Sequence, residues 1–241
     1  MIHDSIVTQP RQILCIAEEQ LLNQLDANIE PFFTDSHSTS TTLQLEHISK
    51  KINEAWLTNS AVNFCAKAYP SVSMAHEDAA ALVILGAFLR NGILHKSIRE
   101  QGGAYGGGAS QDSNNACFRF YSYRDPRMSE TLDDFDASVA WLLENKHTTQ
   151  KLEEAILGTV SSLDRSESPA GRAKRCFHAE LNGRKLESRK LFRERVLATT
   201  MSDLKRVAEK YLREENASVA IVTDKSNKAQ VQKLGLTVQE L

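Results

Sequence analysis

Five of the eleven glycines in this 241-residue chain fall within seven positions, at residues 102–108. The stretch in front of them, Ala79 to Leu89, is apolar and too short to cross a bilayer, which takes about 20 residues, so it predicts a core helix. Because glycine commonly ends helices, the first two glycines predict a stop close behind Arg99. We expect Tyr105 to open a strand that runs back past the end of the helix.

Such a corner would let the guanidinium of Arg99 and the phenol of Tyr105 converge on one ligand. Both groups donate hydrogen bonds, and neither serves readily as a base or nucleophile at neutral pH. Gly106, Gly107 and Gly108 would offer bare backbone beside them. The pattern predicts a site that holds an oxygen-rich ligand, such as a peptide carbonyl.

A purely structural interpretation of the same residues remains open. A cation near a helix C-terminus is favoured by about 0.3–1 kcal/mol through the helix dipole. Tyr105 could cover the edge of the core, and glycines in a strand can mark a bulge or tight packing.

The composition of the chain is ordinary and by itself excludes few classes of function. The chain is 41% hydrophobic and 25% charged with a net charge of -2, so we expect neither a nucleic acid nor a membrane as a partner. The four cysteines lie far apart with no Cys-x-x-Cys pair, which favours thiols and a reducing compartment, either the cytoplasm or an organelle matrix. The first thirty residues show no secretory leader.

The known motifs of metal, serine and phosphate chemistry do not occur. None of the seven histidines has another four positions away, and neither His-x-x-Glu-His nor His-Glu-x-x-His is found, so we expect no metal site on this chain. Gly-x-Ser-x-Gly is missing as well. The glycine segment fits neither the P-loop nor the dinucleotide pattern.

Hydrophobic patterns outline two units of unequal size. Residues 12–17 predict a short buried strand with a helix behind it, and residues 34–42 are polar and predict a linker. The same order of strand and helix returns at residues 218–223 and 227–234. This weak echo indicates two related units, the first of which is present only as its tail.

The larger unit begins with strands and continues with helices. Residues 62–69 and 118–123 alternate and predict two half-buried strands. Helices are expected with caps at Ser129 and at Ser168 before Pro169, and a further helix is expected to begin at Thr200 to Asp203. This order predicts an α+β fold in which a mixed or antiparallel sheet packs against several helices.

Charge is segregated among these helices. Residues 128–167 hold nine acids against three Lys and Arg, whereas residues 172–195 hold nine Lys and Arg against three acids. We interpret this as solvated faces of adjacent helices that attract one another. The alternative is a basic lining for acidic or disordered ligands.

Two stretches carry a resemblance to a known family. The first, Leu89 to Ser110, contains Arg99 and Tyr105 as Arg-x5-Tyr inside the glycine-rich turn, and the second is Phe118 to Pro126 with the sequence FRFYSYRDP. They resemble the last domain of presequence-protease-type members of the insulinase/pitrilysin family of zinc metallopeptidases. The similarity extends from about Ala55 to Thr223.

The resemblance implies a function for the corner. In that family roughly four related α+β domains form two halves that close around a chamber. The first domain carries His-x-x-Glu-His and zinc, and the last contributes an arginine and a tyrosine that touch the peptide near the scissile bond. Those roles fall on Arg99 and Tyr105 as catalytic contacts, with Gly106–Gly108 as substrate-binding backbone.

This sequence departs from the family pattern because it lacks the zinc motif. The resemblance therefore implies a non-catalytic C-terminal domain of a zinc metalloendopeptidase, inactive alone, whose partners are peptide substrates and the N-terminal catalytic half of the same polypeptide. Zinc would be held by another domain. Residues 1–33 would be the closing strand and helix of a preceding related domain, 34–54 a linker, and 55–241 the C-terminal α+β domain.

Two alternatives remain open at this point. One is a non-catalytic scaffold or partner subunit of the same fold. The other is a module that binds a phosphate ligand through the glycine-rich turn.

Overall fold

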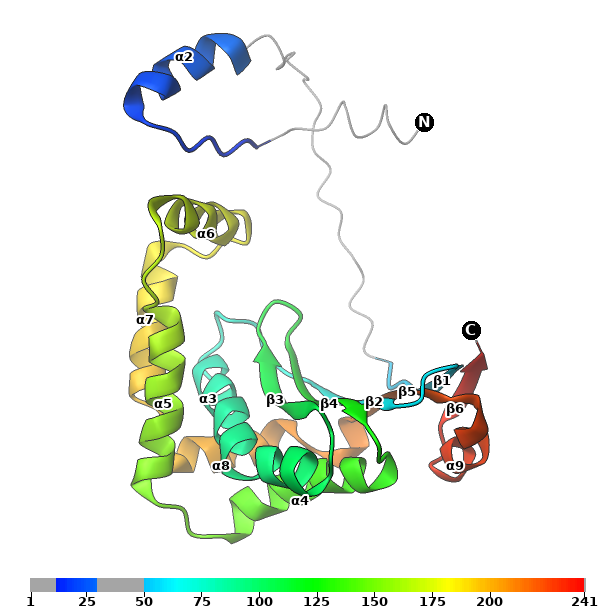
Figure 1. Cartoon of the computed structure of the whole chain (residues 1–241). Helices are drawn as coiled ribbons and strands as arrows, with labels where there is room; N and C mark the ends of the chain where they lie inside the picture. Colours follow the sequence, from blue (N-terminus) through cyan, green and yellow to red (C-terminus); the bar gives the residue numbers. More distant parts are fainter. Residues whose placement is uncertain (1–11, 30–49, 241) are drawn as a thin grey trace. The chain divides into compact units, whose positions relative to one another are not determined.

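The computed structural model describes residues 12–29 and 50–240. The chain divides into two compact units, one of residues 1–48 and 166–185, the other of residues 49–165 and 186–241. Figure 1 shows the trace of the chain, and each unit is described by itself. The first unit includes helix α2 (Glu19–Ile29) and helix α6 (Pro169–Leu181).

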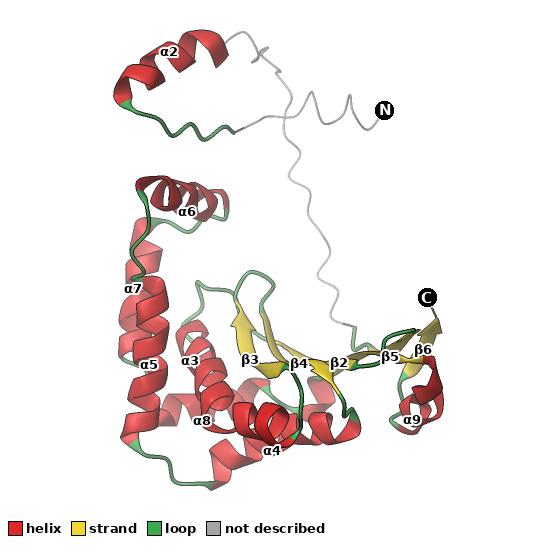
Figure 2. Cartoon of the chain, in the orientation of Figure 1, coloured by secondary structure: helices red, strands yellow, loops and turns green. Residues whose placement is uncertain are grey.

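The second unit is built on one mixed sheet of six strands in the order β3-β4-β2-β5-β1-β6, coloured yellow in Figure 2. Strands β3, β4, β2 and β5 pair antiparallel, whereas β1 pairs parallel with both β5 and β6. This confirms the predicted α+β fold with a mixed sheet. The strands are β1 (Asn53–Thr58), β2 (Asn63–Pro70), β3 (Gly106–Asp112), β4 (Cys117–Asp125), β5 (Ser218–Asp224) and β6 (Thr237–Glu240).

The predicted core helix is longer than its apolar stretch. Helix α3 (Ala79–Leu89) continues without interruption into a π-helix, η2 (Arg90–Gln101). Together they are long and apolar enough to cross a membrane by length and composition alone, but half of the most apolar window is buried inside the structure, as expected of a core helix. The remaining helices are α4 (Ser129–Glu144), α5 (Thr149–Leu163), α7 (Leu186–Leu197), α8 (Met201–Tyr211), α9 (Lys228–Lys233), and the short 3₁₀ turns η3 (Glu214–Asn216) and η4 (Lys225–Asn227).

One of the two predicted helix caps is confirmed, and the helix expected from Thr200 begins there with a cap as well. The Ser168 hydroxyl accepts a hydrogen bond from the N–H of Gly171 at 3.1 Å, and Thr200 forms a reciprocal capping box with Asp203. The prediction for Ser129 was wrong, because the N-cap is Met128 and the Ser129 hydroxyl instead bonds the Glu130 carboxylate at 3.0 Å.

The predicted strand at residues 12–17 is wrong as well. Residues 12–18 have no regular secondary structure, and Ile13, Leu14 and Ile16 are exposed. A strand needs a neighbour to accept its backbone hydrogen bonds, and no strand pairs with this segment within the described ranges. The helix predicted behind it forms as α2, the predicted linker lies largely outside the described residues, and β1 begins two residues before the predicted boundary at residue 55.

Strand β2 alternates as predicted, with its polar set facing the core. Asn63, Cys65, Lys67 and Tyr69 are buried, while Phe64 is 40% exposed. The buried polar groups have partners, because Lys67 Nζ binds both carboxylate oxygens of Asp136, at 2.6 and 2.8 Å. Burial raises the pKa of the Cys65 thiol to about 12, which keeps it protonated and inert.

One predicted attraction between the acidic and basic stretches is present. The Arg193 guanidinium of α7 binds the Asp164 carboxylate behind α5 through two nitrogens, at 3.0 and 2.6 Å. The pair supports the interpretation of adjacent helices that attract one another.

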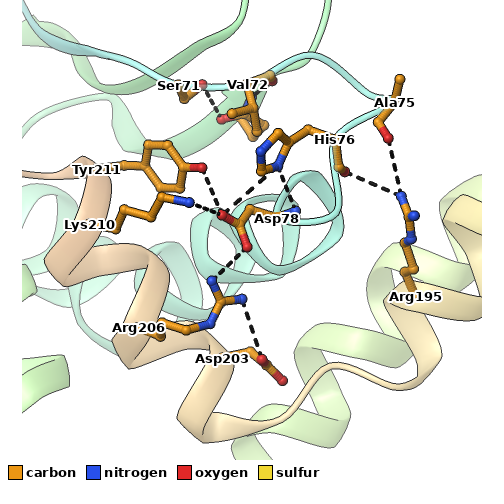
Figure 3. Close-up of polar contacts among 11 residues, drawn as sticks. Ser71, Val72, Ala75, His76, Asp78, Arg195, Asp203, Arg206, Lys210 and Tyr211 are labelled. Carbon is orange, nitrogen blue, oxygen red and sulfur yellow. Dashed lines mark hydrogen bonds and ion pairs between the residues drawn. The ribbon is translucent and has the colours of Figure 1, made fainter.

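The N-terminal end of α3 is held by a buried carboxylate. Asp78, 1% exposed on its side chain, accepts hydrogen bonds from Arg206 at 2.7 Å, Lys210 at 2.8 Å and the Tyr211 hydroxyl at 2.7 Å (Figure 3). Burial by itself would raise the pKa of Asp78, but these three donors outweigh it and hold the pKa well below its usual range. A negative charge here also suits the helix dipole. Helix α8 is thereby fixed to the start of the core helix.

Candidate functional site

The other end of the same helix forms the predicted corner. Helix η2 ends at Gln101, with Arg99 in its last turn. Gly103 takes the left-handed conformation with φ +80, and the N–H of Ala104 donates to the carbonyl of Ile98 at 3.1 Å. Strand β3 then begins at Gly106, one residue after Tyr105. The predicted helix stop and the turn into a strand are thus confirmed.

The side chain of Arg99 lies exposed on the last turn of η2. Its guanidinium comes within 3.5 Å of Nε2 of His95, one turn earlier, and Nδ1 of that histidine lies 3.3 Å from the Glu100 carboxylate. Among the residues that the structure describes, no carboxylate forms an ion pair with Arg99. Apart from the nitrogen that faces His95, its donors therefore remain open to a ligand.

Tyr105 is 65% exposed, and its ring is held from two directions. The Tyr123 ring lies 5.6 Å away between centroids, and the Arg124 guanidinium lies 5.5 Å from the Tyr105 ring centroid. The phenol oxygen has no hydrogen-bond partner within the described part of the chain. Arg99 and Tyr105 therefore both present unused donors on the two sides of one turn.

The three glycines of β3 have packing partners within the chain. A Cβ at Gly106 would collide with the Tyr123 hydroxyl, and one at Gly107 would lie 2.8 Å from Cγ2 of Ile98 and 2.9 Å from the Tyr121 carbonyl oxygen. At Gly108 it would meet the stem of Arg90 at 2.8 Å. Close packing against backbone requires a small residue at Gly107, whereas the neighbours of the other two glycines are side chains. A role for the three glycines toward a ligand stays a prediction.

A bulge in β4 lies directly beside Tyr105, and sequence analysis missed it. Between the pairs Cys65–Ser122 and Asn63–Asp125, β4 has two residues, Tyr123 and Arg124, where β2 has only Phe64. Arg124 adopts φ +49, a left-handed conformation that costs a non-glycine residue about 1–2 kcal/mol. Bulges of this kind commonly turn a side chain towards a functional site.

An aromatic surface adjoins the corner on the outward side of the sheet. The register puts Phe64 of β2 and Tyr123 of β4 on this side, with exposed fractions of 40% and 39%, and Gly106 of β3 lies opposite Tyr123. Small residues fill the neighbouring outward positions Ala66, Ala68 and Ala220. An extended chain lying here would meet the two aromatic side chains, with the charged side chains of Glu54 and Arg119 at the outward positions opposite Ala220 and Ala68.

Metal ligands do not gather in the described residues. No group of three His, Cys, Asp or Glu side chains there could hold an ion. Residues 12–29 and 50–240 therefore do not fit a zinc site of their own.

Comparison with known sequences identifies relatives. The sequence profile of the PreP C-terminal domain matches residues 53–225. A mitochondrial presequence protease of Danio rerio is 40% identical over 151 residues, which are 63% of this chain and 14% of that protein. The corresponding protein of Kluyveromyces lactis is 36% identical over 162 residues, 67% of this chain and 16% of that protein. The chain thus spans about a sixth of the length of the curated relatives that it matches.

Solved structures share the fold at low sequence identity. Pitrilysin superposes with a TM-score of 0.65 at 12% identity, covering 94% of this chain and 25% of that one. A peptidase M16 inactive domain from Pseudomonas fluorescens gives a TM-score of 0.63 at 16% identity, covering 93% of this chain and 53% of that one. The fold, the Arg-x5-Tyr corner and the matched profile agree, and the chain belongs to the family of PreP C-terminal domains.

Proposed function

We propose that this chain serves as the non-catalytic C-terminal domain of a zinc metalloendopeptidase that degrades peptides in a closed chamber. The observation that carries the proposal is the corner at which Arg99 and Tyr105 present exposed donors beside an edge strand, within the stretch matched by the family profile. The relatives are presequence proteases, which makes peptides the substrates of choice.

In this mechanism the domain binds and orients the peptide rather than attacking it. The peptide would pair as an added strand with a sheet edge of the catalytic half, a common mode of peptide recognition. The aromatic surface around Phe64 and Tyr123 would form the facing wall of the chamber. The Arg99 guanidinium and the Tyr105 hydroxyl would then donate to a substrate carbonyl.

Both donors would stabilise the transition state more than the bound substrate. When negative charge develops on the carbonyl oxygen, hydrogen bonds aimed at it strengthen, and closure of the two halves excludes water that would compete for them. Neither side chain needs to transfer a proton. Zinc would belong to the catalytic half and would supply the activation of water there.

The relatives and the thiols support a proposal for the compartment. The similar proteins are mitochondrial, and Cys15, Cys65 and Cys117 show no disulfide. We propose an organelle matrix, a reducing compartment, as the location.

The proposal is tested in the full-length protein that carries this domain. Tyr105→Phe and Arg99→Ala are each expected to lower kcat/KM for an unstructured peptide by about 10- to 1,000-fold, since removal of a single oxyanion donor costs up to about that factor. Arg213→Ala removes an exposed arginine whose Nε bonds the carbonyl of Glu209, and serves as the matched control that leaves kcat/KM unchanged. Unchanged kcat/KM in both corner variants would refute the assignment.

The same experiment distinguishes the proposed substrate contact from the alternative of a non-catalytic scaffold subunit. If this fold acts only as an inert partner, an intact corner contributes no more than the Arg213 control. A drop in kcat/KM without a change in thermal unfolding therefore supports substrate contact.

A further inference from the structure

We propose that Arg124 is a positioning residue for Tyr105, and that the bulge of β4 places it there. This inference rests on the proposed function, because it concerns the phenol that would contact the peptide. It assigns a role to a residue outside the Arg-x5-Tyr pattern.

The bulge lies between two fixed points. On one side Ser122 pairs with Cys65, and on the other Asp125 is fully buried and pairs with Asn63. The Asp125 carboxylate accepts the Thr131 hydroxyl at 2.8 Å and the Arg127 N–H at 3.0 Å. Because both ends are held, the extra residue cannot slide along the strand, and the position of Arg124 is set by the fold.

Arg124 contacts Tyr105 through both its backbone and its side chain. Its carbonyl accepts the N–H of Tyr105 at 3.3 Å, and its guanidinium lies 5.5 Å from the centre of the Tyr105 ring. A cation over an aromatic face is attracted to the ring. The ring is mostly exposed, and this contact and that of Tyr123 lie on its buried part.

The conformation of Arg124 points to the same conclusion. A left-handed backbone is unfavourable for arginine and easy for glycine. Among the described residues no carboxylate pairs with the Arg124 guanidinium, so ion pairing does not account for its presence. Unfavourable backbone geometry kept at a residue that contacts a proposed site is a sign of a functional constraint.

The first test removes or keeps the positive charge at position 124 while the backbone there stays in the left-handed conformation. In the full-length protein, Arg124→Gln keeps a long side chain in the same conformation without the cation, and Arg124→Lys keeps the cation. We expect Arg124→Gln to lower kcat about two- to fivefold, the factor equivalent to an exposed cation–π contact, with KM little changed because the phenol acts in the transition state. Arg124→Lys should restore most of kcat. Equal kcat in the wild type and Arg124→Gln would overturn the inference.

The second test asks whether Arg124 acts through Tyr105. In a Tyr105→Phe background there is no hydroxyl to position, so Arg124→Gln should have no further effect on kcat. An undiminished effect in that background would mean that Arg124 contacts the substrate itself, and would overturn a positioning role.

The third test separates function from stability. Arg124→Gly relieves the left-handed strain, so its unfolding midpoint should equal or exceed that of the wild type while kcat falls as in Arg124→Gln. A lowered midpoint would show that the side chain serves stability, against the inference. If Tyr105→Phe lowers kcat/KM and Arg124→Gln does not, only this inference fails; if Tyr105→Phe is also without effect, the proposed function fails with it.

Discussion

The two ends of the helix from Ala79 to Gln101 use polar side chains in opposite ways. At the N-terminal end Asp78 is buried and bonded by Arg206, Lys210 and Tyr211. At the C-terminal end Arg99 and Tyr105 are exposed, and their donors have no acidic partner among the described residues. Groups that satisfy one another stabilise a fold, whereas groups left open are available to a ligand. The comparison predicts large stability effects at the first end and functional effects at the second.

The sharpest way to break this comparison is Asp78→Ala in the 241-residue chain. The substitution removes the buried acceptor of three hydrogen bonds, while the two cations are half exposed and can be rehydrated, and we expect the free energy of unfolding to fall by about 2–4 kcal/mol. Chemical denaturation followed by circular dichroism measures it. Asp133→Ala, at an exposed position of α4, should change stability by no more than about 0.5 kcal/mol. Equal effects of the two variants would contradict the role of Asp78.

A second expected effect concerns the packing that supports the open end. Gly107→Ala places a methyl group against the Tyr121 carbonyl oxygen and Ile98, and overpacking of this kind costs about 1–3 kcal/mol. Gly158→Ala is the matched control, because nothing lies within 4 Å of that position in α5 and alanine favours a helix by up to about 1 kcal/mol. Relative to the wild type, we expect the unfolding midpoint to fall in Gly107→Ala and to rise in Gly158→Ala. A Gly107→Ala protein as stable as the wild type would show that β3 and η2 are not in close contact.

The pH dependence of stability gives a third, smaller effect. The pKa of Asp78 is lower in the folded than in the unfolded chain, so its carboxylate stabilises the fold above the unfolded pKa of about 3.9, and this contribution is lost as the pH falls below that value. Between pH 7 and pH 3 the wild type should lose about 1 kcal/mol more than Asp78→Asn. Thermal melts over this range compare the two. If the wild type and Asp78→Asn lose stability equally as the pH falls, Asp78 does not account for the pH dependence.

The smallest expected effect lies at the open end itself. Arg99→Ala removes only a favourable position at a helix C-terminus, so the unfolding free energy should change by at most about 0.5 kcal/mol. Differential scanning calorimetry of the same chain is sufficient. A loss comparable to that of Asp78→Ala would mean that Arg99 supports the fold, and the contrast between the two ends would disappear.

Local signals in the sequence predicted the local structure. Ser168 before Pro169 and Thr200 before Asp203 cap helices through bonds that span three residues, so their outcome depends little on the rest of the chain. The corner around Arg99 was predicted for the same reason, because glycines that end a helix act within a few positions. The role proposed for that corner comes from the family resemblance and stays a prediction.

Local patterns in the sequence do not predict contacts between residues that are far apart along the chain. Asp78 finds its partners more than a hundred positions further along the chain, and nothing in its own surroundings indicates them. The same holds for the face of β2, where buried Lys67 is possible only because Asp136 lies opposite. Ile13, Leu14 and Ile16 show the converse, since an apolar pattern predicts a strand without supplying the partner that a strand requires. The bulge at Arg124 depends on the register between β2 and β4, which no local pattern fixes.

The order of the strands has a consequence for synthesis on the ribosome. Strand β1 lies between β5 and β6, so the first strand of the sheet pairs only with the last two. At about 5–20 residues per second, roughly 10 to 30 seconds pass between the emergence of β1 and that of β5. During this interval water takes the backbone hydrogen bonds of the β1 segment, so the sheet cannot close around β1 until translation delivers β5 and β6.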